Sequence, residues 1–176
     1  MGYTMKEIPL SQGKMALVDD EDYAMLMGYK WCVRLANHGN LYAFRIELVN
    51  GRNRGIHMHR VLLKAPDHYQ VDHINGNGLD NRKSNLRLCT QSQNMHNESQ
   101  HSTNTTGYKG VRRDKRKLAR GSRCYSARIT VDKKSYSCGM FKTAEEAAHA
   151  FDEMAIRHVG KFARLNFPEQ PRRDVA

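Results

Sequence analysis

Alternating apolar and polar positions predict strands in the first third of the chain. The segments KMALVD (14–19) and LYAFRIEL (41–48) alternate in this way, which is typical of strands with one buried face. Between them, DDEDYAMLMGYKW (19–31) opens with acidic residues, and these suit the positive end of a helix. The run GRNRGIHMHRVLLKAP (51–66) begins with turn-forming residues, continues with apolar residues and closes at Pro66. It predicts a strand that leads into a short helix.

A strand, a loop, a second strand and a helix are predicted over residues 70–97. A short apolar strand start is followed by a loop rich in Asn, Gly and Asp, and NLRL (85–88) then resumes extended structure. Thr90 and Gln93 have the spacing of a capping box. They predict a helix that carries Asn94 in its first turns.

The last part of the chain predicts a small sheet backed by one helix. Residues 99–107, SQHSTNTTG, are small and polar, as in a linker. Thr143 and Glu146 mark a second capping box, and apolar residues recur every three or four positions over 147–159 until Gly160. The three strands predicted before this helix are YKGVRRDKR, YSARITVD and KSYSCGMF.

The charge of the chain points to an anionic partner. With 29 Lys and Arg against 18 Asp and Glu, the formal net charge is +11 and the sequence pI is about 9.7. Residues 1–98 hold 12 basic and 10 acidic side chains, whereas residues 99–176 hold 17 and 8. The excess could serve solubility alone. Nucleic acid is the leading partner, and its main contacts are expected in the second half.

Other classes of protein are disfavoured by the composition. No apolar stretch is long enough to span a bilayer, and the start MGYTMKEIPL lacks the apolar core of a secretory signal, so a cytoplasmic location is expected. The four cysteines form no CxxC pair, which favours free thiols in a reducing compartment over a zinc ribbon or a disulfide framework.

Four polar residues in the segment 70–97 are candidates for phosphodiester hydrolysis. This reaction needs an activated water, neutralisation of charge on the phosphate oxygens and help for the departing 3′ oxygen, which a base and one divalent cation can supply. Asp72 and His73 are adjacent on a predicted strand, so their side chains should point to opposite sides and cannot both bind one ligand without a local twist. Asp72 as the metal ligand and His73 as the base fit this arrangement. Asn94 can offer an amide oxygen as a second ligand, and oxygen ligands favour Mg²⁺ or Mn²⁺. Asn85 can orient the loop and the His73 ring.

The segment VDHINGNGLDNRKSNLRLCTQSQNMHN (71–97) resembles the ββα-metal motif of HNH nucleases, in the phage and homing endonuclease branch that has Asn as the third motif residue. In that branch the matching positions are a metal-binding aspartate (Asp72), the general base (His73), a structural asparagine (Asn85) and a metal-binding asparagine (Asn94). The preceding MHRVLL, with His59, also resembles the segment before the motif. His57, His59 and His96 are more simply packed or DNA-facing than metal ligands.

A basic stretch follows from Tyr108, and it predicts contacts with phosphates and with guanine edges. A solvated basic loop is the alternative. YKGVRRDKR, YSARITV, CGMFKTAEEAAHAFDEMAIRHVG and LNFP resemble the AP2 (ERF-type) DNA-binding domain, in which a three-stranded sheet enters the major groove. The chain lacks the tryptophans that plant examples place on that sheet, and Ser137 stands where one would fall. The expected DNA-binding residues are Lys109, Arg112, Arg113, Lys115 and Arg128, with Arg52 and Arg54 in the first half.

The sequence therefore predicts an α+β protein, with an HNH nuclease domain at 1–98, a linker at 99–107, an AP2-like domain at 108–168 and a tail at 169–176. The expected function is metal-dependent cleavage of double-stranded DNA, by nicking or by double-strand cutting, as the resemblance implies for a phage or mobile-element homing endonuclease in a bacterial or phage-infected cell. The state is monomer or homodimer. The alternatives are a catalytically inert, sequence-specific DNA-binding regulator and, with less support, a structural zinc module in the first half.

Overall fold

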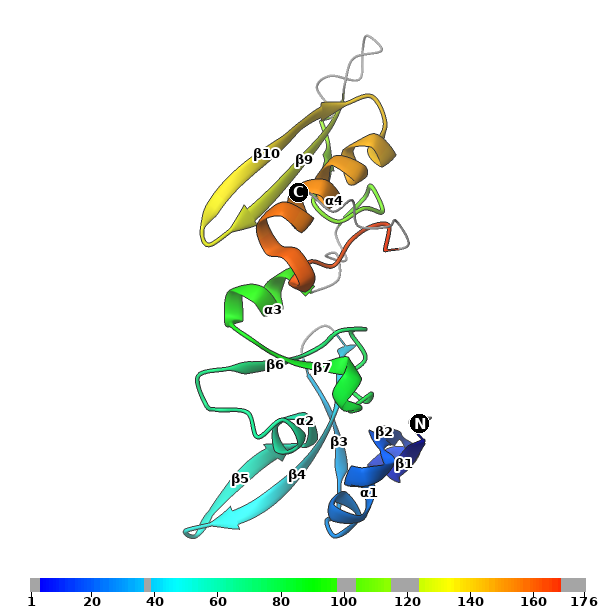
Figure 1. Ribbon diagram of the computed structural model, residues 1–176, viewed down its shortest axis with the longest axis vertical. Coiled ribbons are helices and arrows are strands. Elements are labelled where there is room, and N and C mark those ends of the chain that lie inside the picture. Colours follow the sequence, from blue (N-terminus) through cyan, green and yellow to red (C-terminus); the bar gives the residue numbers. More distant parts are fainter. Residues whose placement is uncertain (1–3, 37–38, 98–103, 115–123, 169–176) are drawn as a thin grey trace. The chain divides into compact units, whose positions relative to one another are not determined.

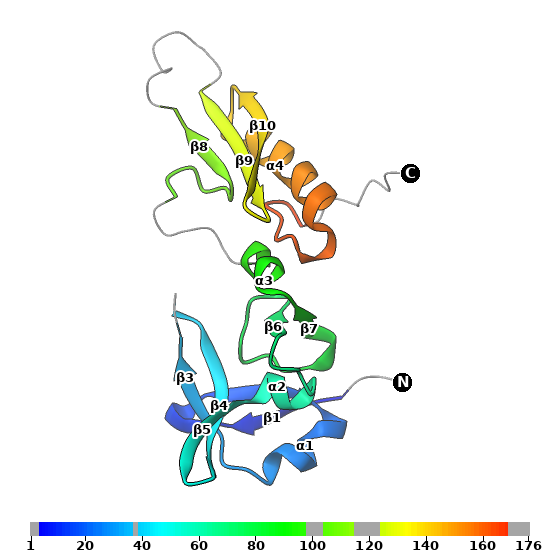
Figure 2. The same cartoon turned by 90° about the vertical axis from the view of Figure 1, so that its left-hand side faces the viewer.

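The computed structural model describes residues 4–36, 39–97, 104–114 and 124–168 (Figures 1 and 2). The chain divides into two compact units, Met1–Asn94 (unit 1) and Met95–Ala176 (unit 2). Both combine helices with small antiparallel sheets, so the expectation of an α+β protein is met. The finer division into a nuclease domain, a linker and an AP2-like domain stays a proposal.

Unit 1 contains three small antiparallel sheets, with strand orders β1-β2, β3-β4-β5 and β6-β7. The strands predicted from alternation, β2 and β4, are confirmed, and so are the predicted helices α1, α2 and α3. The sequence did not reveal β1 and β3, because β1 buries only Ile8 and β3 only Val33, so neither shows the expected alternation. The bounds are β1 Met5–Pro9, β2 Met15–Asp19, α1 Asp20–Met27, β3 Cys32–Leu35, β4 Leu41–Val49, β5 Arg52–His57, α2 Met58–Leu62, β6 Gln70–His73, β7 Leu86–Cys89 and α3 Gln91–Asn97, with 3-10 turns at Ser11–Gly13 and Lys83–Asn85.

The core of unit 1 joins the first hairpin to the later elements. Leu26 of α1 and Met58 of α2 have no exposed surface, and Trp31 is 3% exposed. The indole of Trp31 donates a hydrogen bond of 2.8 Å from Nε1 to the carbonyl of Leu26. A buried indole needs such a partner, and this one ties the end of α1 to the start of β3.

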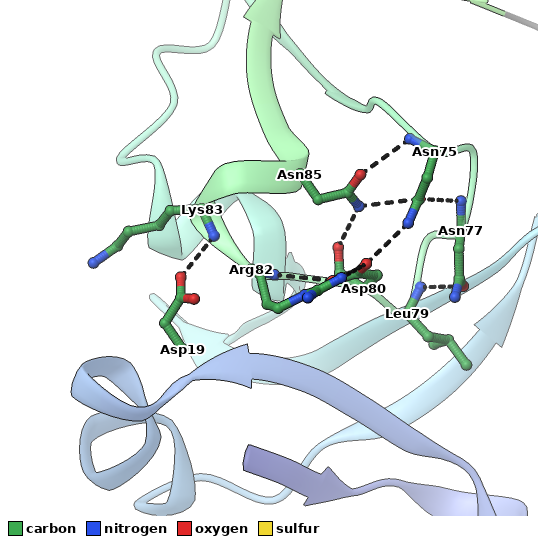
Figure 3. A network of polar contacts seen from close by, with 8 residues as sticks. All are labelled: Asp19, Asn75, Asn77, Leu79, Asp80, Arg82, Lys83 and Asn85. Atoms are coloured by element: carbon green, nitrogen blue, oxygen red, sulfur yellow. Dashed lines mark hydrogen bonds and ion pairs between the residues drawn. The ribbon is translucent and has the colours of Figure 1, made fainter. Parts of the chain in front are cut away.

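The loop between β6 and β7 is fastened to β2. Leu17 donates its amide to the carbonyl of Leu79 at 2.9 Å and accepts from the amide of Asn81 at 2.8 Å, which makes a parallel bridge between Leu17 and Asp80. The amide of Lys83 donates to a carboxylate oxygen of Asp19 at 2.8 Å (Figure 3). These bonds satisfy the backbone of a long loop that has no strand partner of its own.

Unit 2 contains a three-stranded antiparallel sheet of order β10-β9-β8 with the helix α4 packed on one face. The helix begins with the predicted capping box, because Thr143 accepts from the amide of Glu146 and the Glu146 carboxylate accepts from that of Thr143. Its apolar side is buried against the sheet. The bounds are β8 Val111–Arg113, β9 Tyr125–Val131, β10 Lys134–Phe141 and α4 Ala144–Val159, with a 3-10 turn at Gly160–Phe162.

Two polar residues attach the segment after α4 to the start of the sheet. Asp152 is 6% exposed, and its carboxylate accepts from the amides of Asn166 and Phe167 at 2.9 Å each. The Asn166 side chain accepts from the amide of Lys109 at 2.7 Å and donates to its carbonyl at 3.2 Å. The LNFP segment of the AP2 resemblance is therefore part of the packed unit.

Gly110 is required where β8 begins. Its φ is +75°, and a Cβ there would lie 2.1 Å from two ring carbons of Phe151. Gly110→Ala is expected to lower the free energy of unfolding of unit 2 by about 3 kcal/mol, since a left-handed conformation and an overpacked core both cost energy. The measurement is the thermal unfolding of the full chain. Gly107→Ala is the matched control, because Gly107 has φ +79° and no atom within 4 Å of the added Cβ. Equal losses in the two variants would contradict the packing argument.

The structure bears on three further expectations, which concern membrane spans, the cysteines, and the linker and tail. No helix among the described residues has the length and apolar character to cross a membrane. All four cysteines are free thiols. Residues 99–103 of the expected linker and the tail 169–176 lie outside the described residues. The rest of the linker is hydrogen-bonded to the start of β8, since the Thr106 hydroxyl donates to the carbonyls of Tyr108 and Val111 at 3.3 and 3.2 Å.

Candidate active site

The hairpin of β6 and β7 carries two of the four candidate residues. Its register pairs Asp72 with Arg87 and His73 with Leu86. Asp72 and His73 are each 5% exposed, so neither is the turn residue that an Asp-His pair in a loop usually is. Burial of two titratable side chains at the end of one strand favours a functional role.

Asp72 is held by an arginine from the opposite strand. Nε and Nη2 of Arg87 both contact Oδ2 of Asp72, at 2.7 and 2.6 Å. The side chains are 14% and 6% exposed, so the pair is largely desolvated and its geometry is fixed. Arg87 is not among the residues expected from the sequence. The hairpin register would have revealed it, because a residue directly opposite on an antiparallel strand shares the same face.

Asn94 reaches the same side of β6 as Asp72. Its Nδ2 donates to Oε1 of Gln70 at 2.8 Å, and Gln70 lies two residues before Asp72, on the same face of the strand. The capping box that starts α3 is confirmed, since the Thr90 amide donates to Oε1 of Gln93 at 2.9 Å and the Gln93 amide to Oγ1 of Thr90 at 3.3 Å. The cap and the Gln70 contact together fix where Asn94 lies.

Asn85 braces the loop that precedes it (Figure 3). Its Oδ1 accepts from the amide of Asn75 at 3.0 Å, and its Nδ2 donates to Oδ1 of Asn75 at 3.1 Å and to the carbonyl of Asp80 at 2.8 Å. Its own carbonyl accepts from the amide of Ile74, next to His73, at 2.9 Å. Of the two orienting tasks expected for Asn85, these bonds serve the loop directly and His73 through the adjoining backbone.

Asp80 is a second centre of hydrogen bonds in that loop, and it is not among the residues expected from the sequence. It is 2% exposed, and Arg82 donates to it from Nε at 2.8 Å and from Nη2 at 2.6 Å. The side-chain Nδ2 of Asn75 donates to the same carboxylate at 2.9 Å. These hydrogen bonds, chiefly those from Arg82, hold the pKa of Asp80 below its usual value. The carboxylate therefore stays charged and keeps the loop closed.

Three histidines and a tyrosine form a ring cluster beside the hairpin. The rings of His57 and His59 stack at 5.1 Å, and His59 meets His73 edge-on at 5.1 Å. The Tyr42 ring lies 5.6 Å from that of His59 and 5.7 Å from that of His73. The expectation that His57 and His59 are packed is met for His59, which is 8% exposed. The cluster restricts the orientation of His73.

The environment of His73 favours its neutral form. Burial lowers the pKa of His73, while the neighbouring Asn81 side chain and the charges of Asp72 and Asp80 act in the opposite direction. Burial is the larger effect, so the pKa lies below 6.5. A histidine that is neutral near pH 7 can accept a proton.

Beside the cluster lies a pocket of about 470 Å³. It is lined by side chains from β3, β4, β5, α2, β6 and α3, so it opens where the hairpin, the ring cluster and Asn94 come together. The Arg60 guanidinium is engaged with the backbone and donates to the carbonyls of Tyr69, Ala65 and Pro66 at 2.9 to 3.1 Å. The lining residues are Arg34, Leu35, Ala36, Tyr42, His57, His59, Arg60, Gln70, Val71 and Asn94.

The buried histidines predict that unit 1 is sensitive to acid. Burial lowers the pKa of His59 from 6.5 to about 3, so below pH 6.5 the unfolded chain binds a proton that the folded chain does not. Stability is therefore complete above about pH 6.5 and falls as the pH drops toward the folded pKa, by about 2 kcal/mol at pH 5 from His59 alone. Urea unfolding at pH 7 and pH 5 measures this loss. His59→Gln should reduce the loss of stability between pH 7 and pH 5. An equal loss in this variant and in the wild type would contradict the role of His59.

The expected DNA-binding residues fall into distinct places within their units. Arg52 and Arg54 are exposed on β5. The register of unit 2 pairs Arg112 with Ser126 and Ser137 with Arg128, so both arginines lie on the sheet face opposite α4, and both are exposed.

Two other expected DNA-binding residues contact their own unit, and one is not described. The guanidinium carbon of Arg113 lies 5.9 Å from the centre of the Tyr125 ring. The ammonium of Lys109 donates at 2.6 Å to the carbonyl of His96, which lies in the last turn of α3, the part of that helix that belongs to unit 2. Lys115 lies outside the described residues.

The side chains near the hairpin suit a hard cation. A carboxylate (Asp72) and an amide (Asn94) on one side of β6 are the oxygen ligands that Mg²⁺ and Mn²⁺ prefer. Within residues 4–36, 39–97, 104–114 and 124–168, no three His, Cys, Asp or Glu side chains gather as a metal site, so the described part of the chain does not support a zinc module of such ligands. Two protein ligands leave room for phosphate and water.

Comparisons with known proteins assign the segment that carries this hairpin to a family. A family model described as HNH endonuclease matches residues 64–96, which span β6, β7 and most of α3. It ends before the strands of unit 2, so the AP2 resemblance has no support from it. No solved structure matches the chain.

Two viral proteins are similar to the chain. One, an uncharacterized HNH endonuclease of Acanthamoeba polyphaga mimivirus, is 30% identical over 156 residues, which are 88% of this chain and 76% of the relative. The other, Protein 3.8 of Escherichia phage T7, is 32% identical over 101 residues, which are 57% of this chain and 78% of the relative. The motif and the length of the first match show that this chain belongs to the HNH endonuclease family.

Proposed function

We propose that the chain is a metal-dependent DNA endonuclease of phage or mobile-element, homing-type character, which nicks DNA or cuts both strands. The observation that carries the proposal is the hairpin of β6 and β7 with α3, on which Asp72, Asn94 and the buried His73 come together. Membership of the HNH family supports the same reaction.

Asp72 and Asn94 are the proposed ligands of one divalent cation, Mg²⁺ or Mn²⁺. Arg87 orients the Asp72 carboxylate through Oδ2, and Gln70 orients the Asn94 amide by accepting from Nδ2. When bound, the cation would stabilise negative charge on the phosphate and on the departing 3′ oxygen. The product ends expected from the family are 5′-phosphate and 3′-hydroxyl.

His73 is the proposed general base. Its imidazole, kept neutral by burial, takes a proton from the water that attacks phosphorus. The rings of His59 and Tyr42 limit its rotation, and the Asp72 charge next to it favours the imidazolium that forms. Asn85 holds the loop behind it through Asn75 and Asp80.

Unit 2 is proposed to bind DNA as AP2-like domains do, through the sheet face opposite α4. Arg112 and Arg128 lie exposed on that face, where a guanidinium can bind a guanine edge with two hydrogen bonds. The small side chains Ser126 and Ser137 stand opposite them in the register and leave room for a base. Arg52 and Arg54 are proposed to contact DNA from unit 1, and Arg113, Lys109 and Lys115 to add phosphate contacts beside the sheet.

Arg112→Ala is expected to weaken binding of the preferred duplex by about 1–3 kcal/mol and to relax the preference for one base pair. The measurement is the enrichment of duplexes from a random pool by the wild type and by the variant. Arg157→Ala is the control, because Arg157 is exposed on α4, away from that face. An unchanged base preference in Arg112→Ala would contradict the sheet face as the reading surface.

The test of the nuclease is cleavage of supercoiled plasmid with Mg²⁺, with Mn²⁺ and with EDTA. Open-circular or linear product that appears with the cations and not with EDTA is the expected result, and the ratio of the two forms reports nicking against double-strand cutting. DNA binding without cleavage on varied DNA would instead favour the inert DNA-binding regulator.

A further inference from the structure

The outer half of the β4–β5 hairpin is a two-stranded ribbon. The partner strand β3 pairs with β4 only as far as Phe44, whereas β4 and β5 continue to pair out to Val49 and Arg52. Figure 1 shows this hairpin extending away from α2. Residues 45–56 are called the outer ribbon below.

One face of the outer ribbon exposes two large aliphatic side chains. Ile46 and Leu48 alternate onto this face and are 63% and 71% exposed. Their partners across the ribbon are Gly55 and Asn53, so no large neighbour covers them, and a Cβ at Gly55 would meet nothing within 4 Å. Exposed aliphatic side chains on a ribbon with a free edge promote aggregation, so proteins usually retain them only at sites that bind a partner.

The same face leads to the candidate active site. Going inward along the ribbon, the next pair on the same face is Phe44 and His57, and His57 stacks on His59 of α2 and lines the pocket. The rings of His57 and His59 therefore lie at the inner end of this face, and Ile46 and Leu48 lie exposed farther out. A duplex bound at the pocket would continue along this face.

The charges of the outer ribbon suit DNA better than protein. It holds Arg45, Arg52 and Arg54 against one acid, Glu47. Arg45 is engaged with Glu47 at 3.4 Å and lies over the Tyr29 ring at 4.1 Å, while Arg52 and Arg54 are exposed. Two aliphatic side chains offer far less than the roughly 800 Å² per partner that a stable dimer buries. Duplex DNA matches both the arginines and the aliphatic side chains, because its phosphates are negative and its stacked bases are apolar.

We propose that the outer ribbon lies in the minor groove of the duplex beside the cleaved phosphate and inserts Ile46 and Leu48 between stacked base pairs. Aliphatic side chains act as wedges of this kind in proteins that kink DNA from the minor groove. Gly55 lets the backbone approach closely, Asn53 can bond to base edges, and Arg52 and Arg54 on the opposite face reach the phosphates. The inference rests on the proposal that unit 1 binds duplex DNA.

The test is a topology assay with the full chain. Closed-circular plasmid is relaxed by a topoisomerase in the presence of the protein and EDTA, so that no cation supports cleavage. Inserted wedges unwind DNA, so the wild type is expected to leave negative supercoils after the protein is removed. The double variant Ile46→Ser/Leu48→Ser should still retard the plasmid on a gel and lose this shift.

Controls separate the wedge from other causes. Met5→Ser removes an equally exposed apolar side chain (61%) on β1 and should keep the shift, and circular dichroism should show both variants folded. Arg52→Gln/Arg54→Gln should weaken retardation itself.

The proposal would be overturned if the wild type did not bind plasmid, or if it bound plasmid without changing its topology, as a ribbon in the major groove would. It would also be overturned if the double variant shifted topoisomers like the wild type. A protein that shifts topoisomers and never nicks with Mg²⁺ would instead refute the nuclease and leave the wedge standing.

Discussion

His73→Ala is expected to lower the rate of plasmid nicking by about 10² to 10⁴ while DNA affinity stays close to that of the wild type. General-base catalysis supplies acceleration of this size, and a side chain that is 5% exposed contributes little to binding DNA. The measurement is the single-turnover nicking rate at saturating Mg²⁺, with gel retardation in EDTA beside it.

The control for this substitution is His68→Ala. His68 is exposed and lies beside Tyr69, with ring centres 4.6 Å apart and the rings tilted, outside the ring cluster. It should nick at the wild-type rate. If His73→Ala lost DNA binding and nicking to the same degree, His73 would be a residue of the fold or of the interface, and the assignment of the base would be wrong.

Arg87→Met is expected to cost about 3–5 kcal/mol of stability, because it leaves the Asp72 carboxylate buried without the arginine that neutralises it. Asp72→Asn in the same chain should restore part of this loss, since it removes the stranded charge. Urea unfolding of the two single variants and the double variant gives the coupling energy of the pair. A coupling energy near zero would contradict a tight pair.

The same variant should raise the Mg²⁺ concentration that half-saturates nicking, by about 10- to 100-fold, as for other residues that orient a metal ligand. Removing a positive charge would by itself favour the cation, but Oδ2 of Asp72 then loses the contacts from Nε and Nη2 of Arg87. Arg82→Met is the matched control, because it breaks a similar pair with Asp80 and should cost stability at an unchanged Mg²⁺ requirement. A lower requirement in Arg87→Met would show that Arg87 competes with the cation.

The candidate site could be predicted where chemistry is local in the sequence. One hairpin and the helix after it carry Asp72, His73, Asn85 and Asn94. The capping box of Thr90 and Gln93 predicts where that helix starts. Arg87, Asp80 and Tyr42 could not be found in the same way. The role of Arg87 depends on strand register, that of Tyr42 on a ring cluster built from β4, β5, α2 and β6, and that of Asp80 on the bridge to Leu17 of β2. Residue spacing does not encode these tertiary relations.

The fold was predictable where one face of an element is regularly buried. The helix α4 shows its apolar side and its cap in the sequence. The strands β1 and β3 bury one residue each, so they lack an alternating pattern to detect. The two small sheets they complete are defined by tertiary pairing.

The bridge between Leu17 and Asp80 limits how this enzyme can be dissected or fused. The family motif at 64–96 has its β6–β7 loop hydrogen-bonded to β2, a strand that lies more than fifty residues earlier in the chain. A fragment that begins at the motif would leave the amide and carbonyl of that loop to water. A nuclease cassette for grafting onto other DNA-binding modules should therefore start at the first hairpin, and the graft point belongs after α3.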